Sequence, residues 1–117
     1  MERMNDTNTI PTIDDIRAQV KGLTGSDPEF TGHGLHVEFC GVTLSLQWGP
    51  QNYCDNRGPK DISGPCANFE AAAWLNEASD AWLSLDSNGA DVRGWVAWGD
   101  LAALVHDVKV LAHKAGA

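Results

Sequence analysis

Two stretches of the chain, one near each end, place apolar residues at helical spacing. The first follows Thr12, a suitable N-cap with Asp15 three residues later, and Gly22 and Gly25 follow its expected end. The second covers about residues 98–114. The apolar stripes are Ile13, Ile16, Val20 and Leu23 in the first stretch, and Leu101, Leu104, Val105, Val108 and Leu111 in the second. We therefore predict two amphipathic helices, each of which needs a cover for one face.

Apolar and polar residues alternate strictly in two adjacent segments after the first predicted helix. Residues 35–40 and 42–48 follow a period of two and are joined at Gly41, which permits a tight reversal. This pattern predicts a β-hairpin with one apolar face. The following residues, 49–65, are rich in glycine and proline and show no periodicity, so we expect a long loop there.

Residues 67–86 allow two interpretations. Their alanines and leucines favour a helix by propensity. Strands are favoured by a period of two, in which Phe69, Ala71, Ala73 and Leu75 alternate with Glu70, Ala72, Trp74 and Asn76. Because the period of two fits both halves, we predict a second hairpin with its turn at residues 77–80. Asn88 and Gly89 then indicate a turn, and a short strand is expected at residues 92–97.

These elements together predict an α+β fold. We expect a mainly antiparallel sheet of four to five strands, made from two hairpins, with an N-terminal and a C-terminal helix. A chain of 117 residues fits one domain. Residues 12–117 should form that domain, and residues 1–11, which are polar and end in Pro11, should form a flexible tail.

Charge and cysteine usage narrow the expected partners and location. The net charge of -8 disfavours direct binding to nucleic acid or to an anionic membrane. No apolar run reaches the roughly 20 residues that span a bilayer, and the polar N-terminus does not resemble a signal peptide. We therefore expect a cytoplasmic protein with free thiols, although Cys54 and Cys66 are able to pair if the compartment is oxidising.

Tryptophan is the most unusual feature of the composition, with five in the chain. In the predicted second hairpin and the strand after it, Trp74, Trp82 and Trp95 project from the face opposite the small aliphatic residues. That face also carries Glu70, Asn76, Asp86 and Arg93. We predict a partner-binding surface in which the three tryptophans are anchors and Glu70 and Asp86 attract a basic protein. The alternative is structural, with the rings forming cross-strand pairs or lying under the first helix.

The sequence offers little that indicates catalysis or metal binding. His33, His36, Cys40, Cys54 and Cys66 include zinc-ligand types, but their spacing matches no compact zinc motif. Cys54 has only Arg57 and Lys60 nearby to lower the pKa of a thiol nucleophile. We therefore expect a non-enzymatic protein with no metal site and no cofactor.

One segment resembles a known group of proteins. Residues 42–57 read Val-Thr-Leu-Ser-Leu-Gln-Trp-Gly-Pro-Gln-Asn-Tyr-Cys-Asp-Asn-Arg. This segment resembles a Gln-aromatic-Gly and Asn-Tyr-Cys-x-Asn-Arg pattern in small proteins of actinobacterial phages and prophages. The resemblance implies a viral accessory protein in the bacterial cytoplasm that binds a host protein. Our hypothesis for the host protein is a defence or nucleic-acid-processing factor, bound through the acidic tryptophan-bearing face.

The same segment supplies a second candidate site. The side chains of Asn52, Tyr53, Cys54, Asn56 and Arg57 offer polar groups for a ligand, or they satisfy the backbone of a tight turn. A small-molecule or metal-binding module around residues 54–66 is therefore an alternative to the partner-binding surface. A homo-oligomer that buries its own tryptophans is a third.

Overall fold

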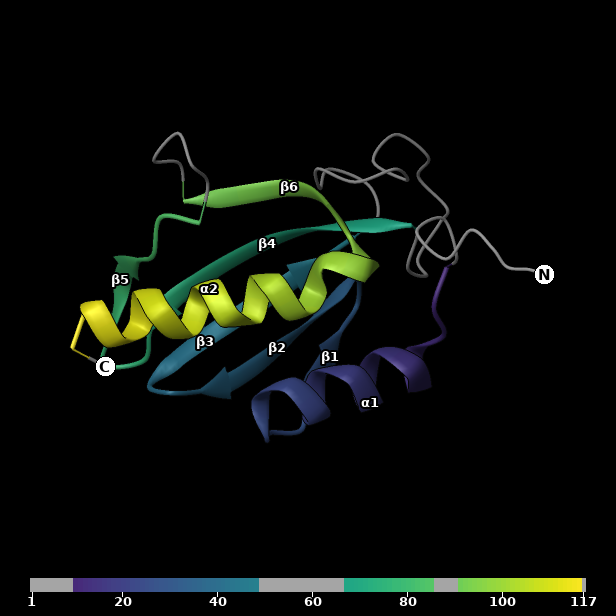
Figure 1. The fold of residues 1–117 in the computed structure, drawn as a ribbon, viewed down its shortest axis with the longest axis horizontal. Coiled ribbons are helices and arrows are strands. Elements are labelled where there is room, and N and C mark those ends of the chain that lie inside the picture. Colours follow the sequence, from purple (N-terminus) through teal and green to yellow (C-terminus); the bar gives the residue numbers. More distant parts are fainter. Residues whose placement is uncertain (1–9, 49–66, 86–90, 117) are drawn as a thin grey trace.

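The structure is a computed structural model of the chain, and it describes residues 10–48, 67–85 and 91–116, with only the backbone of residues 78–80 (Figure 1). The elements in chain order are α1 (Ile13–Thr24), β1 (Glu29–Thr31), β2 (Gly34–Phe39), β3 (Val42–Gln47), β4 (Asn68–Leu75), β5 (Ala78–Trp82), β6 (Val92–Ala97), a 3-10 turn (Trp98–Asp100) and α2 (Leu101–Lys114). The predicted α+β class with an antiparallel sheet and two helices is confirmed.

The sheet is antiparallel throughout, with β1, β2, β3 and β4 in spatial order. Both β5 and β6 pair with β4, where β5 takes Trp74 and Leu75 and β6 takes the stretch from Asn68 to Ala72. Both predicted hairpins are present, and the helical alternative for residues 67–86 is wrong. The turn of the second hairpin lies at Asn76 and Glu77 rather than at residues 77–80, because β5 already begins at Ala78.

Strand β1 is an addition to the predicted sheet. The stretch before Gly34 is rich in turn-forming residues, and we expected no strand in it. In the structure Glu29, Phe30 and Thr31 pair with the first half of β2. Three residues are too few for alternation to be visible in the sequence, so this strand depends on its pairing with β2.

Both predicted helices are present. Thr12 Oγ1 accepts a hydrogen bond from the Asp15 amide at 3.1 Å, and the Thr12 amide donates to Asp15 Oδ2 at 3.2 Å, which completes a capping box. Gly25 ends α1 in the left-handed conformation, with φ 78°. The C-terminal helix was predicted to begin at about residue 98, but the 3-10 turn occupies Trp98–Asp100, and α2 begins at Leu101.

The core lies between the helices and one face of the sheet (Figure 1). Alternate residues of β2, β3 and β4 face it, and α1 contributes Ile16 and Val20. At the junction of β6 and α2, the Trp98 ring lies 4.5 Å from the Phe69 ring and 5.9 Å from the Trp48 ring, measured between centroids. This aromatic cluster fixes the position from which α2 crosses the sheet.

A two-residue turn joins β2 and β3. Cys40 and Gly41 have φ values of 53° and 79°, and Phe39 pairs with Val42. Positive φ at both central residues is the signature of a type I′ turn, whose twist matches that of the strands. Cys40 was predicted to be the last residue of a strand, but the turn takes it instead.

Replacement of Cys40 by asparagine is expected to stabilise the protein by about 0.5–1 kcal/mol. Asparagine accepts the left-handed conformation with less strain than cysteine, and Asn-Gly is the preferred pair for this turn. Urea unfolding of the native chain, of Cys40→Asn and of Cys40→Val measures the change in the free energy of unfolding for each variant. The valine variant should be less stable than the native chain, because a β-branched residue tolerates positive φ poorly. Equal stability of the two variants would contradict the assigned turn.

A bulge in β6 changes the direction of one predicted surface residue. Phe69 pairs with Val96 and Ala71 with Arg93, so two residues, Gly94 and Trp95, stand opposite Glu70 alone. Trp95 has φ 49° at this point. The extra residue reverses the alternation, so the prediction that Arg93 shares a face with the tryptophans is wrong.

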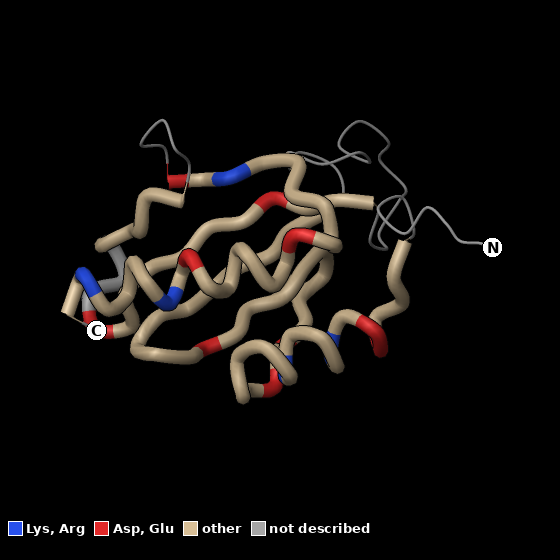
Figure 2. The backbone as a smooth tube through the Cα atoms, viewed as in Figure 1, with Lys and Arg blue, Asp and Glu red and all other residues tan. Residues whose placement is uncertain are grey.

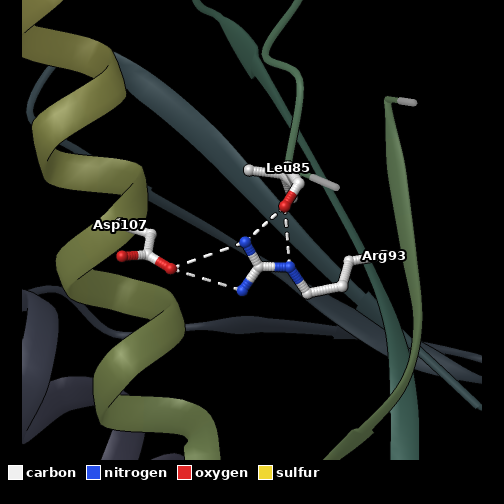
Figure 3. Close-up of polar contacts among 3 residues, drawn as sticks. All are labelled: Leu85, Arg93 and Asp107. Carbon is white, nitrogen blue, oxygen red and sulfur yellow. Dashed lines mark hydrogen bonds and ion pairs between the residues drawn. The ribbon is translucent and has the colours of Figure 1, made fainter. Parts of the chain in front are cut away.

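Arg93 lies instead on the side of the sheet that α2 covers. Its Nε donates to the carbonyl oxygen of Leu85 at 2.7 Å, and Nη2 contacts the same oxygen (Figure 3). Nη1 lies 3.4 Å from Asp107 Oδ2 on α2. This side chain therefore joins β6, the segment after β5 and the middle of α2.

Candidate interaction surface

The face of the sheet opposite the helices, here called the open face, carries the predicted tryptophan site. The alternation in each strand and the cross-strand pairing place on it His36, Glu38, Thr43, Ser45, Gln47, Glu70, Ala72, Trp74 and Trp82. Both described helices pack on the other face (Figure 1). The open face is therefore the part of the described sheet that no described helix covers.

Trp74 and Trp82 form a pair of rings on this face, where β4 is paired with β5. They are directly opposite each other in β4 and β5, and their ring centroids are 4.9 Å apart at an interplanar angle of 56°. Trp74 is half-buried, while Trp82 is 44% exposed. The rings thus make the cross-strand pair of the structural alternative and still present an apolar surface outward.

Trp95 lies apart from this pair. It stands opposite Glu70, which is four residues along β4 from Trp74, or about 13 Å at the rise of a strand. Trp95 is 55% exposed and Glu70 is half-buried. The structure therefore brings together two of the three predicted anchors, while Trp95 and Glu70 form a separate patch. Asp86 lies outside the described residues.

Polar contacts beneath the tryptophan pair hold the two hairpins together. The Thr43 hydroxyl, directly opposite Trp74 in the neighbouring strand, donates to Asn76 Oδ1 at 2.5 Å. The Asn76 amide donates to the Gly41 carbonyl at 3.0 Å. The first bond links β3 to the turn between β4 and β5, and the second links that turn to the turn between β2 and β3.

A hollow lies on the open face beside Trp74, and we call it the acidic hollow. It has a volume of about 430 Å³ and is lined by Ser26, Asp27, Glu29, His36, Glu38, Thr43 and Trp74. The His36 ring meets the Trp74 ring edge-on, with centroids 5.4 Å apart and an interplanar angle of 87°. Three carboxylates thus surround a floor formed by an indole and an imidazole.

Among the described residues, basic side chains balance the charge of the hollow only in part. Strands β1 to β5 contain no lysine or arginine in the described structure, and Figure 2 shows the basic residues on the helices and β6. Asp27 lies 3.4 Å from Lys21, in a pair that is largely exposed. Within the described part of the chain, neither Glu29 nor Glu38 makes an ion pair or a side-chain hydrogen bond.

A larger hollow of about 640 Å³ lies between α1 and the start of α2. Its lining is mostly small or apolar and includes Leu23, Trp98 and Leu101. Asp15 is its titratable residue, and the capping box already engages that carboxylate. The hollow therefore presents no group of side chains that indicates a reaction or a specific ligand.

The loop candidates Asn52, Tyr53, Cys54, Asn56 and Arg57 all lie outside the described residues. In the part that is described, Cys40 is exposed in its turn, away from any cluster of ligands. Across residues 10–48, 67–85 and 91–116, no three side chains of His, Cys, Asp or Glu converge closely enough to hold a metal ion. Of the two candidate sites predicted from the sequence, the one on the open face thus lies, apart from Asp86, within the described residues.

Comparisons of the chain with protein-family models, with curated proteins and with solved structures found no match. Among the described residues, no helix combines the length and the apolar character that crossing a membrane requires.

Proposed function

We propose that this chain is a non-enzymatic binding protein whose open face engages a protein with a basic surface. One observation carries the proposal. An indole pair, the half-buried Trp74 and the exposed Trp82, lies on a sheet face whose strands β1 to β5 carry carboxylates and no lysine or arginine. Such a face combines apolar contact area with one sign of charge.

The two features contribute in different ways to binding. Tryptophan is the residue most enriched among interface positions that dominate affinity, because a large ring buries much apolar area with little loss of side-chain freedom. Carboxylates at the rim, such as Glu38, raise the association rate of a basic partner and disfavour an acidic one. The net charge of -8 acts over a longer range in the same direction.

Trp95 and Glu70 extend the proposed surface along β4. A separation of about 13 Å from Trp74 fits within one side of a standard interface, which buries about 800 Å² per partner. Binding at both patches would need a partner that lies along the strand direction. The Trp74 and Trp82 pair is the stronger anchor, because it combines exposure with a defined mutual geometry.

The resemblance of residues 42–57 to proteins of actinobacterial phages supports a host protein as the partner. A defence or nucleic-acid-processing factor fits this proposal, because the surface with which such a factor binds nucleic acid is basic. The proposed partner is thus a bacterial cytoplasmic protein, and the acidic open face would occupy a site that otherwise meets phosphate.

The test is capture of partners from an actinobacterial lysate by the immobilised chain and two variants. Trp82→Ala should weaken the affinity for a captured partner by about thirty-fold, the effect of losing a dominant interface residue. Val110→Ala is the matched control, because Val110 is also exposed, at 38%, but lies on α2. It should capture the same proteins as the native chain.

Two outcomes would count against the proposal. Capture of the same proteins by Trp82→Ala with unchanged affinity would show that the open face is not the binding surface. A dimeric mass of the native chain in light scattering that becomes monomeric in Trp82→Ala would show self-association through this face instead. Far-ultraviolet circular dichroism of both variants verifies that the fold is retained.

A further inference from the structure

We infer that the acidic hollow receives an arginine side chain of the partner, whose guanidinium stacks on Trp74 and pairs with Glu29 and Glu38. This inference rests on the proposed function, since it names the chemistry that the open face recognises. It goes further by assigning a particular pocket to a particular side chain. The assignment comes from register, charge and the shape of the hollow.

The strand register places the two carboxylates on either side of the pocket. Glu29 is directly opposite His36, and Glu38 follows His36 by two residues on the same face. Glu29 and Glu38 are therefore diagonal neighbours, with Cα atoms about 7–8 Å apart. A single side chain entering between them has one carboxylate on each side.

The indole completes the pocket from the third side. Glu38 is paired with Thr43, and Thr43 with Trp74, so one row of the sheet runs from carboxylate to hydroxyl to indole. The perpendicular contact between the His36 and Trp74 rings helps to hold the indole in place. A cation over an indole face is attracted by the ring's electron density, and tryptophan is the best of the aromatic residues for this contact.

The charges favour an organic cation as the occupant. Glu29 and Glu38 both line the hollow, and in the described structure neither has a cationic partner, so a bound cation would be attracted by both. A metal ion needs ligands that converge on one point, and the described residues offer no such group of three. Carboxylates set apart on two strands suit a wider cation with several donors.

Arginine fits these requirements better than lysine does. Its guanidinium is planar, so it stacks on the indole and still directs N–H groups to both sides in its plane. A lysine ammonium is a compact point charge that approaches one carboxylate at a time. The acidic hollow therefore discriminates by geometry as well as by charge.

Titration of the isotope-labelled full chain with Nα-acetylarginine amide tests this directly. Amide signals of His36 and Thr43 and the indole signal of Trp74 should shift together and saturate, with weak affinity expected for a single side chain. The citrulline analogue, which has nearly the same shape without the charge, should cause no saturable shift. The lysine analogue should bind more weakly than the arginine probe.

Variants of the carboxylates identify the pocket. Glu29→Gln and Glu38→Gln should each weaken arginine binding by about two- to five-fold, and the double variant by about ten-fold, as expected for partly exposed charge pairs. Trp74→Phe should weaken it by a similar two- to five-fold, because phenylalanine keeps the ring but stacks less strongly. Asp14→Asn is the control: it also removes one negative charge, but from the far end of α1, where the Asp14 side chain is 94% exposed.

The results separate this inference from the proposed function. Shifts that are equal for arginine and citrulline, or equal weakening by Asp14→Asn and Glu38→Gln, would overturn the pocket assignment. If Trp82→Ala abolishes partner capture but arginine causes no saturable shift, the open face binds its partner without this pocket. If arginine binds as expected but capture does not depend on Trp82, the pocket stands and the proposed macromolecular surface does not.

Discussion

Replacement of Trp98 by alanine is expected to lower the free energy of unfolding by about 3–5 kcal/mol. Trp98 is only 7% exposed, and its ring packs against Phe69 and Trp48 where β6 leads into α2. Removing it loses the transfer free energy of the indole and leaves a cavity that a rigid sheet cannot fill. Since small domains are stable by about 5–15 kcal/mol in total, this is a large fraction.

Urea unfolding followed by far-ultraviolet circular dichroism measures the loss without depending on the fluorescence of the tryptophan that is removed. Trp95→Ala makes the same chemical change at a position that is 55% exposed, and its effect should stay within about 1 kcal/mol. A midpoint for Trp98→Ala close to that of Trp95→Ala would contradict the assignment of Trp98 to the core.

The strands that the sequence predicted correctly are those with strict alternation. In residues 35–39 and again in residues 42–48 every second side chain is large and apolar, so only one register buries all of them. The second hairpin was harder to predict, because alanine favours helices and the three adjacent alanines, Ala71 to Ala73, obscure the alternation of apolar and polar residues. There the burial of Phe69, Ala71 and Ala73 against the core overrides the local propensity.

The sequence did not predict the features that depend on pairing between distant strands. Strand β1 forms because β2 offers it a partner, and nothing local marks it except the polar-apolar-polar order of Glu29, Phe30 and Thr31. The bulge at Trp95 is likewise invisible in the pattern, because Arg93 to Ala97 alternate as a regular strand would. Local patterns identify faces, whereas bulges and short edge strands arise from the assembled sheet.

These limits explain what was found and what was missed at the candidate site. Trp74 and Trp82 were placed on one face correctly, because each lies in an alternating stretch and the register pairs them. The acidic hollow was missed, because three of its seven lining residues, Ser26, Asp27 and Glu29, lie in or just before the unpredicted strand β1. The alternation at residues 29–31 covers too few residues to have revealed it in the sequence.

Replacement of Arg93 by methionine should destabilise the protein by about 2–4 kcal/mol. The guanidinium donates from Nε to the Leu85 carbonyl at 2.7 Å, and Leu85 is only 1% exposed (Figure 3). A hydrogen bond from a charged donor contributes about 1.5–3 kcal/mol to stability, and methionine has no group that donates to the Leu85 carbonyl in place of the guanidinium. The pair with Asp107 adds up to about 1 kcal/mol, since both side chains are partly exposed. Methionine retains an unbranched apolar chain in place of the methylene groups of Arg93, so the replacement mainly removes the guanidinium.

Asp107→Asn separates the two contributions to the Arg93 contact. It removes the ion pair at 3.4 Å and leaves the hydrogen bond to Leu85, so it should cost less than about 1 kcal/mol. Thermal and urea unfolding of both variants give the comparison. An equal loss in Arg93→Met and Asp107→Asn would mean that the contact with Leu85 adds no stability. The larger loss expected for Arg93→Met would show that the bulge at Trp95, by turning Arg93 toward α2, joins β6 and the segment after β5 to the helix.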